Sequence, residues 1–255
     1  MTTTGRLDPP RHPRTSRSAS PRWSIQLLGG FSVTGKSGVV ALPESTWRLV
    51  ALLALNDQPM LRGRVAGTLY GDKDEEHAQA SLRSALWRLN QATPGLVETD
   101  CHVLRLARGT RVDLADLQDL AARLDQGLPF EVDAVNPILW CADLLPDWDD
   151  AFIDDHRELV RQVRLRTMES LARRLCETAH WGTALRLALL AVRQAPMRES
   201  AHQVVLEIHL AEGNVSEALR HYRALSGTLW RELGIRPSER LRSIIAPYRT
   251  PLPAD

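Results

Sequence analysis

The stretch SLRSALWRLNQA, from Ser81 to Ala92, decides the fold of the first half of the chain. Its apolar residues recur at the i, i+3, i+4 and i+7 positions that share one face of a helix: Leu82, Ala85, Leu86 and Leu89. The acidic run Asp74 to Glu76 precedes this stretch, where carboxylates stabilise a helix N-terminus, and Pro94-Gly95 follows it. The sequence therefore predicts an amphipathic helix that packs one face on a core.

Two more helices and several short strands surround this segment. Trp47 to Leu55 is apolar nearly all round, whereas Leu61, Val65 and Leu69 form a stripe at every fourth residue. Short apolar runs bounded by turn residues predict strands and a closing hairpin: Ile25 to Leu28, Phe31 to Val33, Val39 to Leu42, Leu96 to Thr99 and Val103 to Leu106. The order of strands, three helices and hairpin is that of a winged helix-turn-helix, a small α+β fold.

Beyond Val112 the strand signal disappears and helical periodicity continues. The predicted helices are Leu114 to Leu124, Leu159 to Leu175, Ala184 to Ala195, Ala201 to Leu210 and Glu217 to Leu233. Ala184-Leu185-Arg186 recurs 34 residues later as Ala218-Leu219-Arg220, and this offset is the period of the tetratricopeptide helix pair. The second half is therefore predicted to be an all-α, tetratricopeptide-like repeat domain of two or three units.

Composition divides the 255 residues into three predicted regions. Residues 1–22 contain five arginines, several prolines and few apolar residues, which predicts a disordered basic tail. The winged helix then takes residues 23–111, and the helical domain takes residues 112–255. The tail lacks the apolar core of a secretory signal, and no apolar run is long enough to span a membrane. We therefore expect a cytoplasmic, nucleoid-associated protein in which Cys101, Cys141 and Cys176 are packing residues.

The exposed face of the Ser81 to Ala92 helix carries the side chains that could read DNA. Arginines reach guanine edges in the major groove, and small polar residues allow close approach; the predicted base-reading residues are Arg83, Ser84, Trp87 and Arg88. Contacts to the DNA backbone are assigned to Arg48, Arg62, Arg64, Ser81 and Arg105. The alternatives are an ordinary solvated face with two arginines and, for Trp87, packing against the wing or the repeat domain.

The sequence contains no motif of an enzyme. The glycine, serine, histidine and cysteine patterns of nucleotide-binding, hydrolytic and zinc sites are all missing. Six aspartates crowd residues 143–155, a density that suits a hard metal ion, but they lack the glycine turn and terminal glutamate of a calcium loop. We therefore predict no catalytic residue and no metal site, and we interpret the aspartates as a solvated loop with helix caps.

Between Trp23 and Arg242 the chain resembles the Streptomyces antibiotic regulatory proteins. The markers are IQLLGGFSV (Ile25 to Val33), VAGTLYGD (Val65 to Asp72), SLRSALWRL (Ser81 to Leu89), LLPDWDDAF (Leu144 to Phe152), RESAH (Arg198 to His202), AEGNVSEALRHY (Ala211 to Tyr222) and ELGIRPS (Glu232 to Ser238). These proteins join an OmpR-type winged helix to a bacterial transcriptional activator domain. The resemblance rests on the order and spacing of the markers together.

The resemblance implies an activator of transcription that binds direct repeats in promoter DNA, as a homodimer on the DNA, and recruits RNA polymerase holoenzyme. It also implies control of an antibiotic or other secondary-metabolite gene cluster, with no cofactor. The loop before the third helix faces polymerase in OmpR-type domains, which assigns this contact to Asp72, Asp74, Glu75 and Glu76. The alternative function is a protein-interaction module with weak or lost DNA binding, because residues 23–110 carry nine basic and eight acidic side chains.

Overall fold

The computed structural model describes residues 22–56, 58–100, 102–129 and 142–248. The predicted disordered tail, except Arg22, therefore lies outside the described residues, as do Cys101 and Cys141. Cys176 is half-buried and packs beside a hydrophobic core, as expected of a packing residue. Among the described residues, none of the helices is both long and apolar enough to cross a membrane.

A four-stranded sheet opens the fold. Its strands are β1 (Trp23–Gln26), β2 (Ser32–Gly35), β3 (Gly38–Val39) and β7 (Arg111–Val112), in the order β3-β2-β1-β7. The strand β7 was not predicted, and it pairs in parallel with β1. The strand β1 ends at Gln26 because the backbone N–H groups of Leu27 and Leu28 donate to the Asp113 carboxylate at 2.9 to 3.0 Å instead of to a strand.

Three helices and a second sheet complete the predicted winged helix. The helices are α1 (Glu44–Leu55), α2 (Arg62–Leu69) and α3 (Glu75–Ala92), and the strands are β4 (Met60–Leu61), β5 (Val97–Asp100) and β6 (Val103–Leu106). The hairpin β5–β6 is the predicted wing, to which the unpredicted strand β4 adds a third strand. Asp74 caps α3 as expected, since its side chain accepts a hydrogen bond from the His77 backbone N–H at 2.9 Å.

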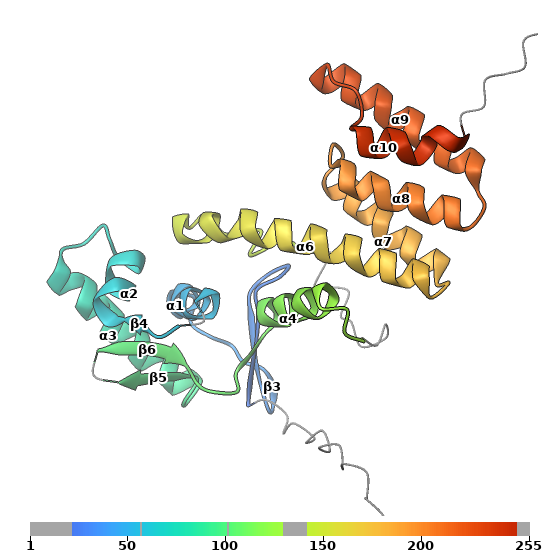
Figure 1. Cartoon of the computed structure of the whole chain (residues 1–255). Coiled ribbons are helices and arrows are strands. Elements are labelled where there is room, and N and C mark those ends of the chain that lie inside the picture. The colour runs from blue at the N-terminus through green and yellow to red at the C-terminus, as the bar shows by residue number, and fades with distance from the viewer. Residues whose placement is uncertain (1–21, 57, 101, 130–141, 249–255) are drawn as a thin grey trace, which may run out of the picture.

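From Asp113 onward the described residues form helices and no named strand, as predicted. The elements of this half are α4 (Asp113–Asp125), α6 (Ala151–Glu177), α7 (Trp181–Gln194), α8 (Glu199–Ala211), α9 (Val215–Leu233), α10 (Glu239–Ile245) and the 3-10 turn η2 (Ala246–Tyr248). The helices α6 and α7, then α8 and α9, form two successive antiparallel pairs (Figure 1). Ala184 and Ala218, the repeated alanines, are both fully buried, in α7 and α9.

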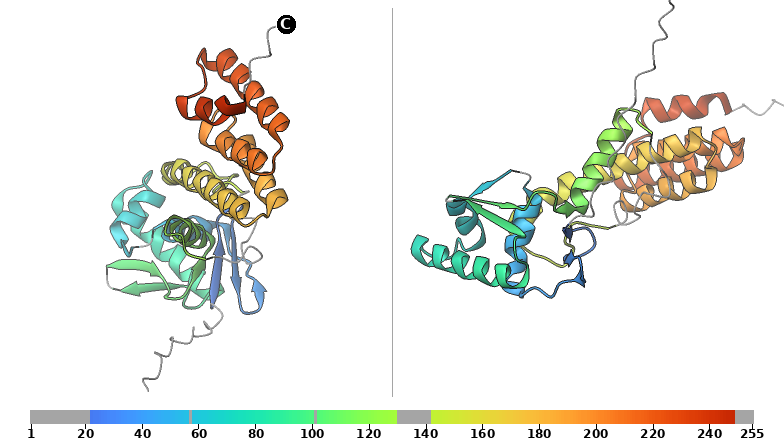
Figure 2. Two further views of the ribbon diagram at one scale, coloured as in Figure 1. Left: turned by 45° about the vertical axis from the view of Figure 1, so that its right-hand side comes forward. Right: turned by 90° about the horizontal axis from the view of Figure 1, so that it is seen from below.

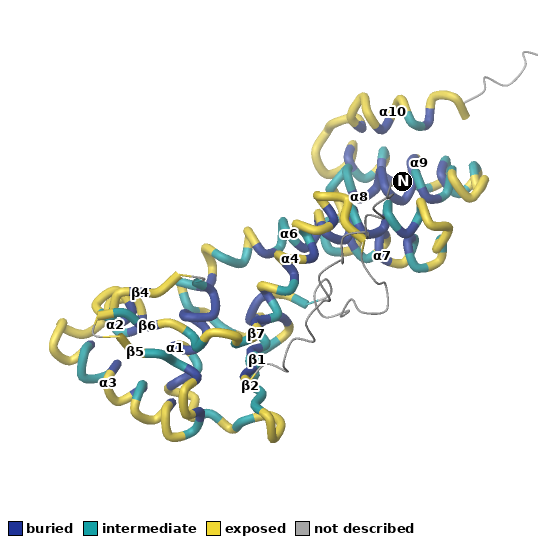
Figure 3. The backbone as a smooth tube through the Cα atoms, turned by 60° about the horizontal axis from the view of Figure 1, so that its bottom comes forward, coloured by how far each residue is buried: buried dark blue, intermediate teal, exposed yellow. Residues whose placement is uncertain are grey.

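Three hydrophobic cores lie along the molecule (Figure 3). The first is the core of the winged helix, but it also contains seven side chains from beyond residue 111: Val112, Leu114, Leu117, Leu144, Leu145, Ile153 and Val160. The second lies between α4, α6, α7 and α8, and the third between α8, α9 and α10. The predicted boundary at residue 111 stays a prediction, and the helices that follow it supply part of the first core.

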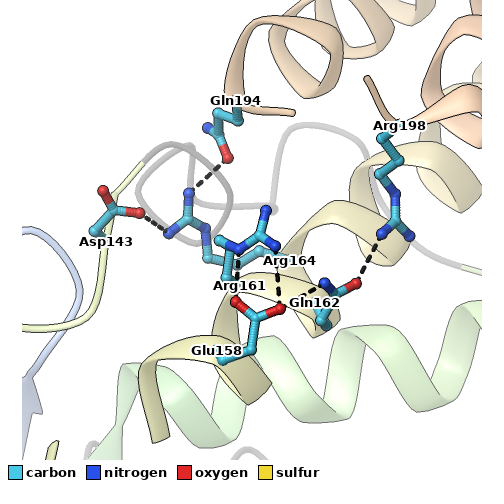
Figure 4. Close-up of polar contacts among 7 residues, drawn as sticks. All are labelled: Asp143, Glu158, Arg161, Gln162, Arg164, Gln194 and Arg198. Atoms are coloured by element: carbon cyan, nitrogen blue, oxygen red, sulfur yellow. Dashed lines mark hydrogen bonds and ion pairs between the residues drawn. The ribbon is translucent and has the colours of Figure 1, made fainter. Parts of the chain in front are cut away.

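Residues 142–150, which we call the connecting segment, attach the repeat helices to the first sheet. Leu144 bridges to Leu28, the Gly29 N–H donates to the Asp143 carbonyl at 2.8 Å, and the Leu145 N–H donates to the Leu27 carbonyl at 2.9 Å. On the other side, the buried Arg164 guanidinium of α6 contacts the Asp143 carboxylate at 2.6 Å and donates to the Gln194 side chain at 2.7 Å (Figure 4). One short segment is thus fixed to both halves of the protein.

Three of the six aspartates of residues 143–155 make ion pairs with arginines. Asp143 contacts Arg164, Asp150 contacts Arg48 at 2.6 Å, and Asp154 contacts Arg157 at 2.6 Å. Asp150 occupies the N-cap position of α6 without a capping hydrogen bond from its side chain, and Asp154 lies in the first turn of this helix. In the described part of the chain, no group of three or more His, Cys, Asp or Glu side chains is arranged to hold a metal ion.

A pair of histidines joins α8 to α9. His202 Nε2 donates to the Pro196 carbonyl at 2.9 Å, so its Nδ1 accepts from His221 Nε2 at 2.9 Å. Burial lowers the pKa of both side chains, and the neighbouring His202, His209 and Arg220 help to bring that of His221 to about 4. Both imidazoles are therefore neutral in the folded state at pH values where they would be protonated in the unfolded chain.

The free energy of unfolding is expected to fall as the pH drops from 6.5 toward 4, since the unfolded chain then binds protons that the folded pair excludes. His221→Gln keeps a donor for His202 but does not titrate. It should reduce this pH dependence by about 1 to 3 kcal/mol, where the upper value corresponds to the full shift from 6.5 to about 4 and the lower one allows for the partial exposure of the ring to solvent. Denaturant titrations of both proteins at several pH values measure the difference, and identical pH profiles would contradict the assignment.

Candidate nucleic-acid interface

The helix α3 presents the two faces that its sequence predicts. Ala78, Leu82, Ala85 and Leu89 are buried in the first core, and Leu86 is partly buried beside it. Arg83, Ser84, Trp87 and Arg88 are exposed on the other side, and the Ser84 hydroxyl donates to the Ala80 carbonyl at 3.0 Å. The helix lies at the end of the molecule opposite α8–α10 (Figure 2), so the repeat helices do not cover this face.

Trp87 is the most exposed of the tryptophans that the structure describes. Its side chain keeps 66% of its accessible surface, so the alternative that it packs against the wing or the repeat domain is wrong. Exposed tryptophan is unfavourable in water and usually marks a contact surface. Together with Arg83, Ser84 and Arg88 it lines a shallow hollow of about 400 Å³.

A larger groove of about 790 Å³ lies between the N-terminal half of α3, the start of α1 and the loop that joins α2 to α3. It brings together four of the predicted DNA-contacting residues, namely Arg48, Ser81, Ser84 and Arg88. Four other polar residues also line it, and no pattern in the sequence assigns them to DNA binding: Ser45, Tyr70, Lys73 and His77. The arginines and Lys73 make the groove suitable for phosphate, although Asp72 and Asp74 also line it.

Arg48 is held in place at the edge of this groove. Its Nη1 donates to the Leu69 carbonyl at the end of α2 at 3.1 Å, and its Nη2 contacts the Asp150 carboxylate at 2.6 Å. Burial raises the pKa of the neighbouring Tyr70 hydroxyl, against the opposing effect of Arg48 and Arg88. The Arg48 side chain still has 45% of its surface exposed, so a phosphate can approach the guanidinium.

The remaining predicted backbone contacts lie outside the groove. Arg62 and Arg64 are in the first turn of α2, where Arg62 is half-buried and Arg64 is exposed. Arg105 is on the wing, where it contacts Glu98 at 2.7 Å and lowers the pKa of that carboxyl group. The fold therefore separates the five predicted backbone residues into a groove set, Arg48 and Ser81, and three more distant positions.

The predicted polymerase contacts are all exposed, but they differ in their surroundings. The Asp74 carboxylate caps α3 by accepting a hydrogen bond from the His77 backbone N–H, and it also contacts the His77 side chain at 2.7 Å. These two contacts lower the pKa of Asp74. Asp72 lines the groove. Glu75 and Glu76 form the first turn of α3. The loop therefore contributes to the groove on one side, through Asp72, Lys73 and Asp74, and presents carboxylates to solvent.

Two comparisons relate this chain to known proteins. Residues 99–247 match the family model described as the bacterial transcriptional activator domain. A solved structure of Mycobacterium tuberculosis EmbR in complex with a low affinity phosphopeptide superposes with a TM-score of 0.67 at 20% sequence identity, and the match covers 91% of this chain. The chain spans 66% of the length of that structure. No curated protein sequence matches the chain closely enough to count as a relative.

Proposed function

The chain belongs to the bacterial transcriptional activator domain family. From this premise we propose that it activates transcription, like the Streptomyces antibiotic regulatory proteins that it resembles, by binding specific promoter DNA through α3. The observation that carries the proposal is the exposed face of α3. There Arg83 and Arg88 make no hydrogen bond or ion pair with any residue that the structure describes, and Trp87 and Ser84 lie between them. A helix with such a face fits the major groove of B-DNA, which is about 12 Å wide.

The division of roles follows from the positions of the side chains. We assign the reading of base edges to Arg83, Ser84, Trp87 and Arg88, because they lie on the exposed face of α3. We assign contacts with the DNA backbone to Arg48 and Ser81 in the groove beside α3, where the ion pair with Asp150 offsets part of the Arg48 charge, and to Arg62, Arg64 and Arg105 on α2 and the wing. We propose that two copies of the chain bind promoter direct repeats, as the resemblance to the antibiotic regulatory proteins implies.

The direct test of DNA binding is selection of duplexes from a random pool with the full chain. Enrichment of a repeated motif would support the proposal and provide the operator for the measurements below. If nothing is enriched, the result favours the alternative function, a protein-interaction module with weak or lost DNA binding. A specific observation favours that second candidate: Arg48 and Arg105, two of the five backbone residues, are already engaged with Asp150 and Glu98.

Activation further requires a contact with RNA polymerase holoenzyme, which we assign to the acidic loop of residues 72–76. Its carboxylates suit a basic surface of polymerase, because complementary charge steers association. The regulated genes would belong to a secondary-metabolite cluster, as in the antibiotic regulatory proteins that the chain resembles.

The double variant Glu75→Gln/Glu76→Gln is expected to lower transcription from a promoter that carries the selected operator by about fivefold, because it removes two exposed carboxylates that face polymerase. Binding of the protein to the operator should change less than twofold. A run-off transcription assay with purified polymerase and a binding titration measure the two effects separately. Asp74 is left unchanged, since its side chain caps α3.

The matched control is Glu212→Gln/Glu217→Gln, which removes the same charge from the opposite end of the molecule. It should leave transcription unchanged. Equal transcription by the wild-type protein and the Glu75/Glu76 variant would refute the assignment of the loop.

A further inference from the structure

The ion pair between Arg48 and Asp150 joins the DNA-reading half of the protein to the repeat half. Arg48 lines the groove beside α3, whereas Asp150 is the last residue of the connecting segment, directly before α6. Their side chains meet at 2.6 Å, with 45% of the Arg48 side chain and 19% of the Asp150 side chain exposed. The Asp150 carboxylate is therefore the more buried partner, and part of the Arg48 side chain stays open to solvent.

Asp150 is held in this position by its neighbours along the chain. Arg157 of α6 donates to the carbonyl groups of Leu144, Leu145 and Trp148, at 3.3 Å and 2.8 Å for the first two. The Trp148 ring packs against Phe31 and Trp47, with ring centroids 5.4 and 6.4 Å apart. Trp47 directly precedes Arg48 in α1. The contact between Trp47 and Trp148 therefore helps to fix the distance between the Arg48 and Asp150 side chains.

The charge of Asp150 matters at this place because the groove has few cations. Of the three Lys and Arg side chains that line it, Lys73 donates to the Ser81 hydroxyl at 2.9 Å and Arg48 is paired with Asp150. A carboxylate in contact with a guanidinium offsets its charge toward a third group, and a DNA phosphate at Arg48 would also be repelled by Asp150. The groove thus presents less positive charge than its residues suggest.

We propose that Asp150 sets the sequence specificity of DNA binding by neutralising Arg48, so that contacts to the DNA backbone alone are too weak to retain the protein on unspecific DNA. This inference rests on the proposed function and assigns to Asp150 the role of a positioning residue that acts through Arg48. Contacts to phosphate provide affinity for every sequence, whereas base contacts distinguish sequences. A protein with fewer effective phosphate contacts therefore keeps a higher ratio between specific and unspecific affinity.

The variant Asp150→Asn tests the proposal in the full chain. At about 0.1 M salt its affinity for a scrambled duplex should rise roughly three- to eightfold, and the slope of log affinity against log salt should steepen by about 0.9, as expected for one more neutralised phosphate. Affinity for the selected operator should rise less, so the ratio of specific to unspecific affinity should fall. The salt slope is informative because a merely structural role for Asp150 would not steepen it.

Three further variants serve as controls. Asp149→Asn removes the same charge one residue away, from an exposed side chain, and should leave the slope unchanged. Asp150→Glu keeps the charge and should behave like the wild-type protein. In an Arg48→Met background Asp150→Asn should have no effect on the slope, because the cation through which it acts is missing. Thermal unfolding of each protein reports whether a variant has lost stability.

The outcomes separate this inference from the function on which it rests. If the wild-type protein binds no DNA, the proposed function fails and this inference fails with it. If the wild-type protein binds the operator and Asp150→Asn matches Asp149→Asn in slope and affinity, only this inference is overturned. Weaker binding of both duplexes by Asp150→Asn would also overturn it, since Asp150 would then hold Arg48 in a productive position.

Discussion

The double variant Arg83→Ala/Arg88→Ala is expected to lose about 2 to 6 kcal/mol of binding free energy for the selected operator, the equivalent of roughly 30-fold or more in affinity. Both guanidinium groups lie on the exposed face of α3, where no described residue competes for them, so their removal takes away two contacts to base edges or phosphates. The measurement is a fluorescence anisotropy titration of labelled operator with the full chain. Affinity for a scrambled duplex should fall much less.

A matched control removes two exposed arginines from the other end of the molecule. Arg223→Ala/Arg240→Ala changes the net charge by the same amount in α9 and α10 and should leave operator affinity within twofold of the wild-type value. Thermal unfolding and circular dichroism should show both double variants fully folded, because none of the four side chains is buried. Unchanged operator binding by the Arg83/Arg88 variant would show that α3 is not the reading helix.

The fragment of residues 22–112 is expected to lack a cooperative unfolding transition, although it contains every strand and helix of the winged helix. It loses Leu114, Leu117, Leu144, Leu145 and Ile153, which are buried in the first core. Burial of one such side chain contributes about 1.5 to 3 kcal/mol, so their sum is comparable to the 5 to 15 kcal/mol that stabilises a typical domain. The fragment also loses the Asp113 carboxylate, which leaves the Leu27 and Leu28 N–H groups without their acceptor.

The comparison is a longer fragment, residues 22–163, which ends at the last residue that packs on the first core. It should unfold cooperatively in thermal and denaturant titrations monitored by tryptophan fluorescence. If the short fragment unfolds with the same midpoint as the long one, the residues beyond 112 are dispensable for the winged helix, and the shared core described above has no energetic importance.

Much of the fold follows from periodicity in the sequence. The helix α3 could be predicted because its apolar residues recur at helical spacing and its ends carry acidic and turn residues, and the repeated Ala184 and Ala218 both lie at buried helix contacts. The two-residue strands β4 and β7 could not be predicted, because each is defined by pairing with a distant segment instead of by its own pattern. The helix α6 begins at Ala151, before the predicted Leu159. Its start could not be predicted, because the apolar Phe152 and Ile153 are followed by five polar residues, Asp154 to Glu158, and no apolar stripe continues through them.

The candidate site was predictable only where it lies on one helix. The exposed face of α3 follows from its buried face, which places Arg83, Ser84 and Arg88 correctly on the outside. Trp87 was open to two interpretations, since its exposure depends on where the wing and the repeats lie. No spacing rule relates Arg48 to Asp150 or brings Lys73 beside Ser81, because the connecting segment and the loop before α3 meet these residues only in the folded protein.

The measurement that tests the account most directly is the affinity of the full chain for the selected operator and for a scrambled duplex of equal length, at about 50 mM and about 200 mM salt. The account predicts that the operator binds at least about 1,000-fold more tightly than the scrambled duplex at the higher salt, and that affinity for both falls as salt rises. Equal affinity for the two duplexes would contradict it, because the face of α3 would then carry no information about sequence.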